Sequence, residues 1–196
     1  MRRLMRIPFK RKNQKKTDYK KRLKLLIAKK PRVVVRKSLN NILVQITKFS
    51  LDGDKIEVST NSRNLVKLGW KYHRGNVPAA YLTGLLCGVK AKQKNIKEAV
   101  LDIGIYPSIK GSVLYASLNG LVDAGLKINH SKEILPSEDK ISGKHITDYA
   151  RFLLKTDKEK YKKQFSKYIK NQIKPEEIPT SFQEVKNLIL KGDKKW

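Results

Sequence analysis

The chain has 196 residues, and its 45 lysines and arginines against 17 aspartates and glutamates give a formal charge of +28. Since 39% of the residues are hydrophobic, the chain can bury the core of one domain, which excludes a wholly disordered protein. Excess charge of this size repels itself in the compact state, so we expect a polyanionic partner, with nucleic acid favoured over an anionic membrane surface.

Membrane-spanning and secreted classes are not supported by the sequence. No apolar run approaches the ~18–20 residues that a membrane span needs, and no secretory signal pattern follows Met1. The single cysteine, Cys87, excludes an internal disulfide framework. The opening stretch MRRLMRIPFKRK is poor in acids, as in a transit peptide, but it lacks the serines. We therefore expect a cytoplasmic protein with no membrane partner.

The positive charge is concentrated at the ends of the chain. Residues 1–37 hold 17 lysines and arginines and one acid, whereas residues 38–150 hold 15 and 10, and residues 151–196 hold 13 and 6. No apolar pattern accompanies the charge over residues 2–16, so residues 1–16 are predicted to form a flexible arm that orders only against phosphates. The alternative is a merely solvated tail. The candidate RNA ligands here, with one cation of the following helix, are Arg2, Arg3, Arg6, Lys10, Arg11, Lys12, Lys15, Lys16 and Arg22.

A helix and three strands follow the arm. Thr17 is a candidate cap for a helix that places Tyr19, Leu23, Leu26 and Ile27 on one face and ends at Lys29-Lys30-Pro31. Three segments rich in Val, Ile and Thr, separated by the turn signals Asn40-Asn41 and Asp52-Gly53, predict an antiparallel meander. These segments are Arg32–Lys37, Ile42–Phe49 and Lys55–Thr60.

Helices and a buried strand complete the predicted core, residues 17–150. Ser62 opens a short helix that Gly69 closes, and Asn76 caps a longer apolar one, in which Gly84 and Gly88 predict tight packing against the sheet. The segment Glu98–Gly104 predicts a fully buried strand, parallel to its neighbour. A further helix over Ser112–Ala124 is closed by Gly125. This order predicts an α/β fold with a mixed sheet, a three-stranded antiparallel meander plus one parallel strand, and packed helices.

Residues 151–196 are predicted to form a basic helical extension. Apolar residues recur at helical spacing over Ile141–Leu154, and Thr156 with Glu159 forms a capping box for a lysine-rich helix. Pro175 and Pro179 are expected to break that helix before a last short one opens at Ser181. Such amphipathic pieces need a surface, either the core domain or RNA.

Catalytic and metal-binding patterns are scarce. The three histidines lie far apart without a Cys or acid at ligand spacing, Cys87 sits in an apolar helix, and no phosphate-binding glycine motif is present. We therefore expect no enzyme activity, metal or cofactor. The main alternative is an RNA-processing nuclease of the ribonuclease-H-like fold, which needs several carboxylates at strand ends. Asp102 is alone on its strand, and the first strand carries Arg32 and Arg36 instead. A DNA-compacting protein is the third candidate.

Two segments have the composition of an RNA-binding surface. Alternation along the first strand places Arg32, Arg36 and Ser38 on one face, near Asn40, Asn41 and Gln45, with no carboxylate before Asp52. The alternative is a solvated outer sheet face. In the loop GWKYHRGN, rings alternate with cations, as in sites where splayed bases stack; its candidate ligands are Trp70, Lys71, Tyr72 and Arg74, although Trp70 is equally consistent with a core residue.

Several ungapped motifs resemble a known family. The runs TDYKKRLKLLIAKKPRVVVRKSLNNILVQI, GWKYHRGNVPAAYLTGLLCG, AVLDIG and HSKEILPSEDKISGKHI are similar to the large-subunit ribosomal protein eighteen family, called L-five in eukaryotes. The resemblance covers Thr17–Ala150 and is greatest to the archaeal and eukaryotic branch. It implies an α/β protein without catalytic residues or cofactor that binds 5S ribosomal RNA and docks it on the large-subunit RNA of the central protuberance, among neighbouring ribosomal proteins.

The resemblance also implies which residues touch 5S RNA. They are the arm and the segment that contributes Arg36, Lys37, Ser38, Asn40, Asn41 and Gln45. Leu39 departs from the family pattern, which usually has Asn at this position.

Overall fold

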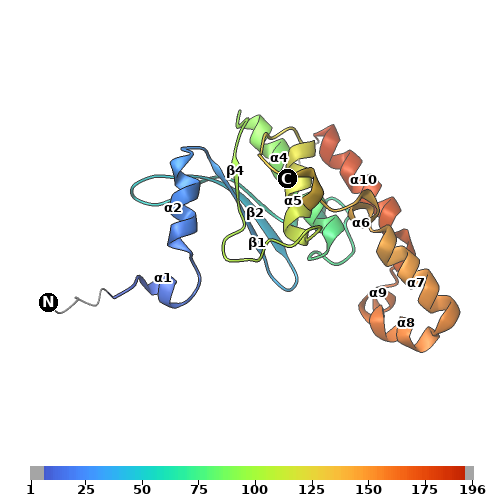
Figure 1. The fold of residues 1–196 in the computed structure, drawn as a ribbon. Coiled ribbons are helices and arrows are strands. Elements are labelled where there is room, and N and C mark those ends of the chain that lie inside the picture. The colour runs from blue at the N-terminus through green and yellow to red at the C-terminus, as the bar shows by residue number, and fades with distance from the viewer. Residues whose placement is uncertain (1–6, 193–196) are drawn as a thin grey trace.

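A mixed four-stranded sheet organises the computed structural model, which describes residues 7–192 (Figure 1). The strands are β1 (Arg32–Lys37), β2 (Ile42–Lys48), β3 (Lys55–Asn61) and β4 (Val100–Asp102). They lie in the order β3-β2-β1-β4, with β1 antiparallel to β2 and parallel to β4. The predicted α/β fold and mixed sheet are therefore confirmed.

Helices lie on both sides of this sheet. In Figure 1, α2 lies on one side, and α4 and α5 lie on the other. Among residues 7–192, no helix is long and apolar enough to cross a membrane. The helices are α1 (Lys10–Asn13), α2 (Tyr19–Ile27), α3 (Asn64–Lys67), α4 (Val77–Gln93), α5 (Val113–Asp123), η1 (Lys132–Ile134), α6 (Glu138–Ser142), α7 (Lys144–Thr156), α8 (Lys158–Gln164), α9 (Ser166–Lys170), η2 (Pro175–Glu177) and α10 (Ile178–Lys191).

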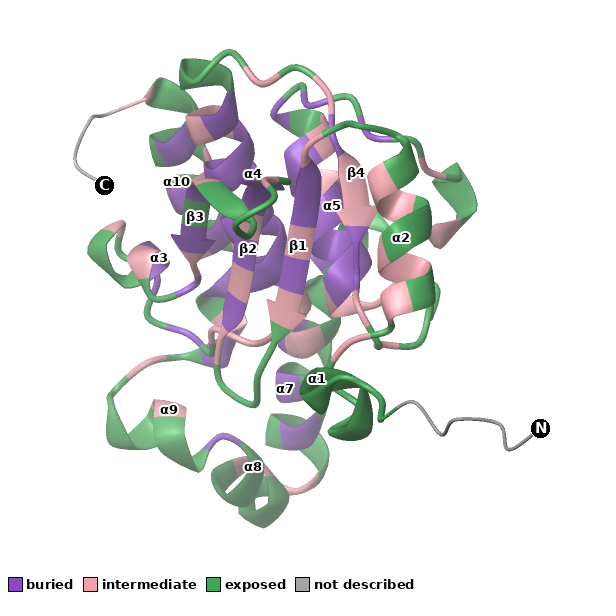
Figure 2. Ribbon diagram, turned by 90° about the vertical axis from the view of Figure 1, so that its left-hand side faces the viewer, coloured by how far each residue is buried: buried purple, intermediate pink, exposed green. Residues whose placement is uncertain are grey.

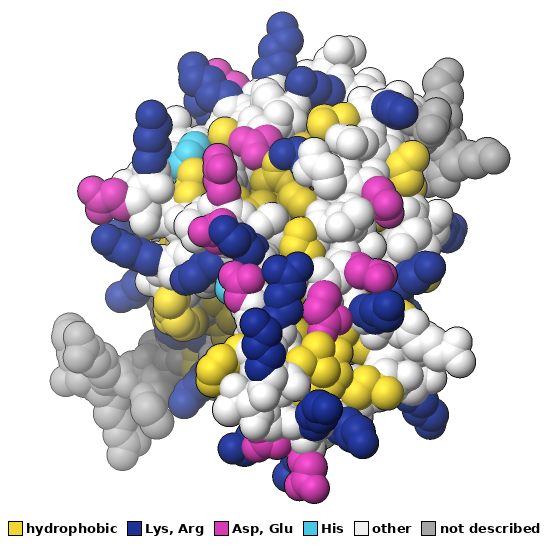
Figure 3. All heavy atoms as spheres, turned by 90° about the vertical axis from the view of Figure 1, so that its right-hand side faces the viewer, with side chains coloured by type: hydrophobic (Ala, Val, Ile, Leu, Met, Phe, Trp, Pro, Cys, Tyr) yellow, Lys and Arg dark blue, Asp and Glu magenta, His cyan; other side chains and the backbone are white. Residues whose placement is uncertain are grey.

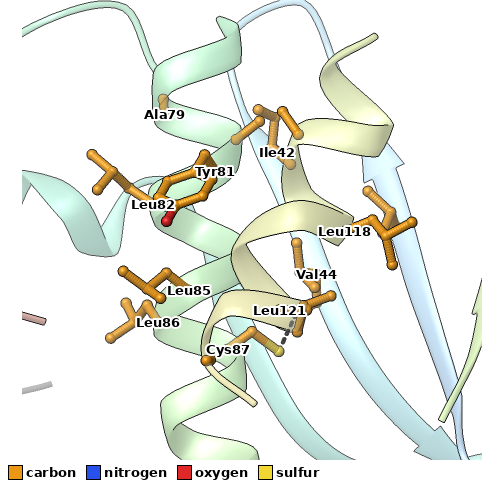
Figure 4. Close-up of a cluster of buried hydrophobic side chains, with 14 of the residues drawn as sticks. Ile42, Val44, Ala79, Tyr81, Leu82, Leu85, Leu86, Cys87, Leu118 and Leu121 are labelled. Atoms are coloured by element: carbon orange, nitrogen blue, oxygen red, sulfur yellow. Dashed lines mark hydrogen bonds between the residues drawn. The ribbon is translucent and has the colours of Figure 1, made fainter. Parts of the chain in front are cut away.

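The period-two pattern of the strands separates an inner from an outer sheet face. Val33 and Val35 of β1 pair with Ile46 and Val44 of β2, and all four are fully buried. Figure 2 shows the resulting stripes of burial on β1 and β2, and Figure 4 shows side chains of β2, α4 and α5 gathered in the inner core. The intervening residues, including Arg36, point to the outer face, where burial is incomplete.

The two central helices touch backbone to backbone. A Cβ atom on Gly84 would lie 2.1 Å from the carbonyl oxygen of Ser117, and one on Gly120 would lie 2.2 Å from that of Tyr81. Gly84 and Gly88 therefore pack against α5. The predicted packing of this helix on the sheet is confirmed, but other residues make that contact, among them Cys87, which lies against Val44 of β2. Because α4 is buried on most sides, its glycine spacing predicts a close neighbour without indicating which one.

Three helix starts differ from those predicted. Asp18 caps α2 in place of Thr17, and Asp157 caps α8 in place of Thr156, because each carboxylate accepts two backbone N–H groups of the first turn. Pro179 lies in the first turn of α10, where its missing N–H costs nothing, so it begins a 14-residue helix instead of ending one. The buried strand is shorter than predicted, and two of its three residues are only partly buried.

The C-terminal extension joins the core through one helix and forms a small hydrophobic cluster of its own elsewhere. Ile178, Phe182, Val185 and Ile189 of α10 belong to the same hydrophobic cluster as the sheet. The helices α7 and α8 enclose a second, small cluster of Ala150, Leu153 and Phe165. The predicted boundary between residues 150 and 151 lies inside α7.

Substitution of Gly84 by alanine tests the helix contact. Alanine favours an isolated helix by about 1 kcal/mol over glycine, but the added methyl group would overlap Ser117, and overpacking of a core costs about 1–3 kcal/mol or more. We expect Gly84→Ala to lower the free energy of unfolding in urea, whereas Gln93→Ala, exposed at the end of the same helix, leaves it within about 0.5 kcal/mol. An increase for Gly84→Ala would contradict the close contact.

Burial also makes a prediction for Cys87. Burial raises the pKa of its thiol to about 12, and Sγ lies 3.9 Å from the carbonyl oxygen of Val44 (Figure 4). Since the thiolate is the nucleophile, an aromatic disulfide reagent at mildly alkaline pH should not react with the native protein and should react fully in denaturant. Rapid reaction of the folded protein would show that the core opens locally.

Candidate nucleic-acid interface

The outer sheet face, α2 and the end of the arm enclose a cavity of about 310 Å³. Its walls carry six cationic side chains and three carboxylates, so it is strongly charged but not purely basic. The charged residues are Arg11, Lys16, Lys21, Arg22, Arg32, Arg36, Asp18, Asp54 and Asp102. The segment between Arg32 and Asp52 carries no carboxylate, as the sequence shows, but the fold brings Asp54 and Asp102 to this surface.

Arg32 is buried within this cluster, with 3% of its surface exposed. Its Nη1 donates to Asp102 Oδ2 at 2.8 Å, and its Nη2 donates to Asp54 Oδ2 at 2.5 Å. Both terminal nitrogens are thus occupied by carboxylates, and the guanidinium is not presented to an incoming phosphate. Arg32 was predicted as an RNA ligand from its place on the strand. The sequence alone does not reveal that Asp54 and Asp102 fold onto its guanidinium.

The same carboxylates hold two further arginines. Arg22 of α2 donates to both oxygens of Asp54 at 3.1 Å, which ties the helix to the turn between β2 and β3. Arg36 donates to the Asp102 carbonyl at 3.1 Å, and its Nη2 lies 3.7 Å from the Asp102 carboxylate. The Arg36 side chain is 40% exposed, so it is both positioned and open to solvent.

Gly104 makes room for the Arg36 guanidinium. Its φ of +65° is a left-handed conformation, and a Cβ atom there would lie 3.0 Å from Arg36 Cζ. Its N–H donates to the Asp102 carboxylate at 2.8 Å, and its carbonyl accepts from Lys21 Nζ at 3.0 Å. The backbone after β4 therefore links α2 to the site of Arg36.

The tip of the β1–β2 hairpin projects beyond this cluster. The Ser38 hydroxyl accepts from the Asn41 N–H at 3.0 Å and closes the turn. Leu39 is 92% exposed, and Lys37 and Asn40 are exposed beside it. Asn41 Oδ1 is buried and has no hydrogen-bond partner among the described residues. Gln45 lies lower on β2, where its amide donates to Ser59 at 3.2 Å.

The aromatic residues of the loop Gly69–Asn76 face inwards. Trp70 is 1% exposed and Tyr72 is 5% exposed, and their rings are 5.3 Å apart. Burial raises the pKa of Tyr72, whose hydroxyl donates to the carbonyl of Lys174 in the extension at 3.1 Å. Neither ring is available to stack on a base. The predicted RNA-binding roles of Trp70 and Tyr72 are therefore not compatible with this structure, in which both residues belong to the core.

The cations of this loop line a second groove, of about 830 Å³. Lys71 and Arg74 lie on one wall, Asn40 of the hairpin tip joins them, and α8 and α9 form the opposite wall. The structure thus brings together two predicted sites that are distant in sequence. It adds Gln164, Lys167 and Asn171, which the sequence did not indicate because nothing in it reveals where the extension docks.

The described part of the arm lies beside α2. Lys10, Lys12, Lys15 and Lys16 are exposed, and Arg11 Nε donates to the Thr17 hydroxyl at 2.9 Å. The ring of Phe9 lies 5.3 Å from that of Tyr19, which anchors this end of the arm. The remaining predicted ligands of the arm, Arg2, Arg3 and Arg6, lie outside the described residues.

The face formed by the C-terminal helices differs from these surfaces. Figure 3 shows that acidic and basic side chains are interleaved there, around exposed hydrophobic side chains. Phe152 of α7 and Leu190 of α10 are 59% and 54% exposed. A mixed face of this kind suits protein contacts better than a phosphate backbone.

The nuclease alternative requires clustered carboxylates that can bind metal ions. Asp54 and Asp102 do meet, but each is hydrogen-bonded to arginine. Within residues 7–192, no group of three or more His, Cys, Asp or Glu side chains has the arrangement of a metal site. The carboxylates therefore hold arginines in this fold.

Comparison with protein families gives a match over half of the chain. A family model described as "Ribosomal large subunit proteins 60S L5, and 50S L18" matches residues 3–100. This range includes residues 3–16 of the arm, α2, the β1–β3 meander and α4.

The buried ion cluster predicts that substituting the two arginines of β1 lowers the free energy of unfolding by different amounts. Arg32→Ala would leave Asp102 buried without its main partner, and breaking a buried pair costs about 3–5 kcal/mol. Arg36→Ala removes a half-exposed guanidinium and should cost about 1 kcal/mol or less. Urea unfolding of both variants measures the difference, and equal losses would contradict the assigned roles.

Proposed function

Because the chain belongs to the family of the large-subunit ribosomal proteins 60S L5 and 50S L18, and is thus an rRNA-binding ribosomal protein, we propose that its main partner is 5S ribosomal RNA. In this proposal it attaches 5S RNA to the large-subunit RNA in the central protuberance of cytoplasmic ribosomes, without catalytic activity or cofactor. The observation that carries the proposal is the positioned, half-exposed Arg36 guanidinium beside the projecting hairpin tip.

The chemistry of the hairpin favours RNA over DNA. The Arg36 guanidinium can pair with a phosphate in two-point fashion. The exposed Asn40 amide at the hairpin tip can donate and accept, and a ribose 2′-hydroxyl is a partner that DNA lacks. DNA compaction would instead require equal affinity for duplex DNA and folded RNA, which a competition experiment distinguishes.

We assign different tasks to the arm and the hairpin. Phosphate contacts by the arm position the RNA without reading its sequence, whereas the hairpin recognises a looped junction of 5S RNA. We accordingly keep a basic arm (residues 1–16), a 5S-binding core (residues 17–150) and a C-terminal extension (residues 151–196). Mg²⁺-dependent cleavage of 5S RNA by the purified protein would instead favour the nuclease alternative.

Removal of the arm should weaken RNA binding in a salt-dependent manner. Each phosphate contact contributes roughly 0.7–0.9 to the log–log slope of affinity against salt, so deletion of residues 1–16 should flatten that slope on any folded RNA. A full-length variant with the eight arm cations changed to glutamine is the matched control and should behave alike. An unchanged slope would mean that the arm is a solvated tail.

Changes at the hairpin should act selectively on 5S RNA. Arg36→Ala combined with Asn41→Ala should cost about 1–3 kcal/mol of 5S affinity and little on unrelated RNA. The control, Arg63→Ala with Asn64→Ala, removes the same side-chain types at α3. Binding isotherms on 5S and control RNA decide the outcome. If the arm deletion abolishes 5S preference while the hairpin variant keeps it, the roles are reversed.

A further inference from the structure

We propose that the groove between the loop Gly69–Asn76 and α8–α9, named here the loop–α9 groove, is a second RNA site that binds a single-stranded segment. This inference rests on the proposed function in that the partner is RNA. It concerns a surface whose second wall is contributed by the C-terminal extension, so it extends the interface beyond the sheet and the arm.

Charge is the first reason. The groove is lined by Lys71, Arg74 and Lys167, and none of its lining residues is an aspartate or glutamate. The cavity on the outer sheet face, by contrast, has three carboxylates among its cations. The lining of the loop–α9 groove therefore carries cations without carboxylates among them, which favours a polyanion.

The hydrogen-bonding groups of the groove suit nucleobases. Asn40, Gln164 and Asn171 present exposed amides, which can donate to and accept from base edges. His73 Nδ1 accepts from the Gly75 N–H at 3.1 Å, which fixes the imidazole ring. Burial, followed by the nearby charges of Lys167 and Arg74, lowers the pKa of His73. A lowered pKa favours the neutral ring, and because Nδ1 accepts a hydrogen bond, the neutral ring carries its proton on Nε2 as a donor.

The size and walls of the groove suit an unstacked nucleotide. A cavity of about 830 Å³ lies within the roughly 300–1,000 Å³ range of pockets that bind compact organic ligands. Val66 is 51% exposed on one wall, and the partly buried ring of Tyr168 lies 5.7 Å from that of Tyr72. Apolar surface between cations and amides favours a splayed base over a duplex, whose bases are stacked and inaccessible.

The extension is held in register with the loop. The His73 N–H donates to the Tyr168 hydroxyl at 3.1 Å, and the Tyr72 hydroxyl donates to the Lys174 carbonyl at 3.1 Å. The first bond holds α9, which carries Lys167, against the loop that carries Arg74. The amides and neutral imidazole favour RNA over an acidic peptide, which needs only cations.

A matched pair of charge reversals on α9 tests the proposal in the full-length protein. Lys167→Glu changes a residue that lines the groove, and Lys170→Glu makes the same change on the same helix outside it. The probe is a short polyuridine oligomer, and polyglutamate is the acidic-peptide competitor. We expect Lys167→Glu to weaken oligomer binding about tenfold or more, as for loss of a specific contact, and Lys170→Glu to weaken it only slightly.

Two controls separate the outcomes. Circular dichroism verifies folding, and if Lys167→Glu is unfolded, Lys167→Ala and Asn171→Ala replace it, with Lys170→Ala as their control. Equal effects of the groove and control variants would overturn the proposal, as would displacement of the oligomer by polyglutamate of equal charge concentration. Preference of the wild type for 5S RNA over a control RNA is measured separately. If the wild type showed no such preference, the proposed function would be overturned. The comparison of oligomer binding by the groove and control variants would still test whether the groove binds RNA.

Discussion

The outer face of the sheet depends on a chain of alternating charges that runs from Arg22 through Asp54, Arg32 and Asp102 to Arg36. Its central guanidinium is buried, and a buried charge is tolerated only when it is paired and hydrogen-bonded. The requirement to pair Arg32 joins β1, β4 and the β2–β3 turn, and Asp54 then binds α2. The half-exposed Arg36 is consequently presented in one orientation beside the hairpin tip.

The opposite face of the sheet supplies the rigidity behind this arrangement. Gly84 and Gly120 allow α4 and α5 to meet at backbone distance, so the inner layer has little room to adjust. β1 has Val33 and Val35 in that packed layer, and Arg32 and Arg36 in the charged outer layer. A single strand therefore couples the hydrophobic core to the proposed RNA-binding surface, which suits recognition by a preorganised surface more than by a mobile one.

The C-terminal extension has two physical characters. The helix α10 completes the main core, whereas α9 and the segment after it rest on the loop Gly69–Asn76 through hydrogen bonds of Tyr168 and Tyr72. The aromatic side chains of that loop are buried in the folded chain, whereas its cations line the surface groove. The loop therefore holds the extension in place, and the groove between them is lined by cations.

Local patterns in the sequence were sufficient for the architecture. Segments rich in Val, Ile and Thr with turn signals between them located β1, β2 and β3. Asn76 marked the start of α4 through its capping bond to the Ala79 N–H, and the apolar segment after α4 predicted the parallel strand. These features depend on residues within a few positions of one another. The excess of cations likewise predicted a polyanionic partner, since it is a property of composition alone.

The tertiary structure alone decided which of the candidate ligands are exposed. Arg32 is withdrawn from the surface by carboxylates that lie 22 and 70 positions away. Tyr72 is buried against the extension, whose docking has no local signature. The same long-range folding brings Asn40 next to Arg74 and Lys167. The residue type fixes whether a side chain is charged or aromatic. Whether that side chain is exposed to a partner or packed against the chain itself depends on the distant residues that the fold brings next to it.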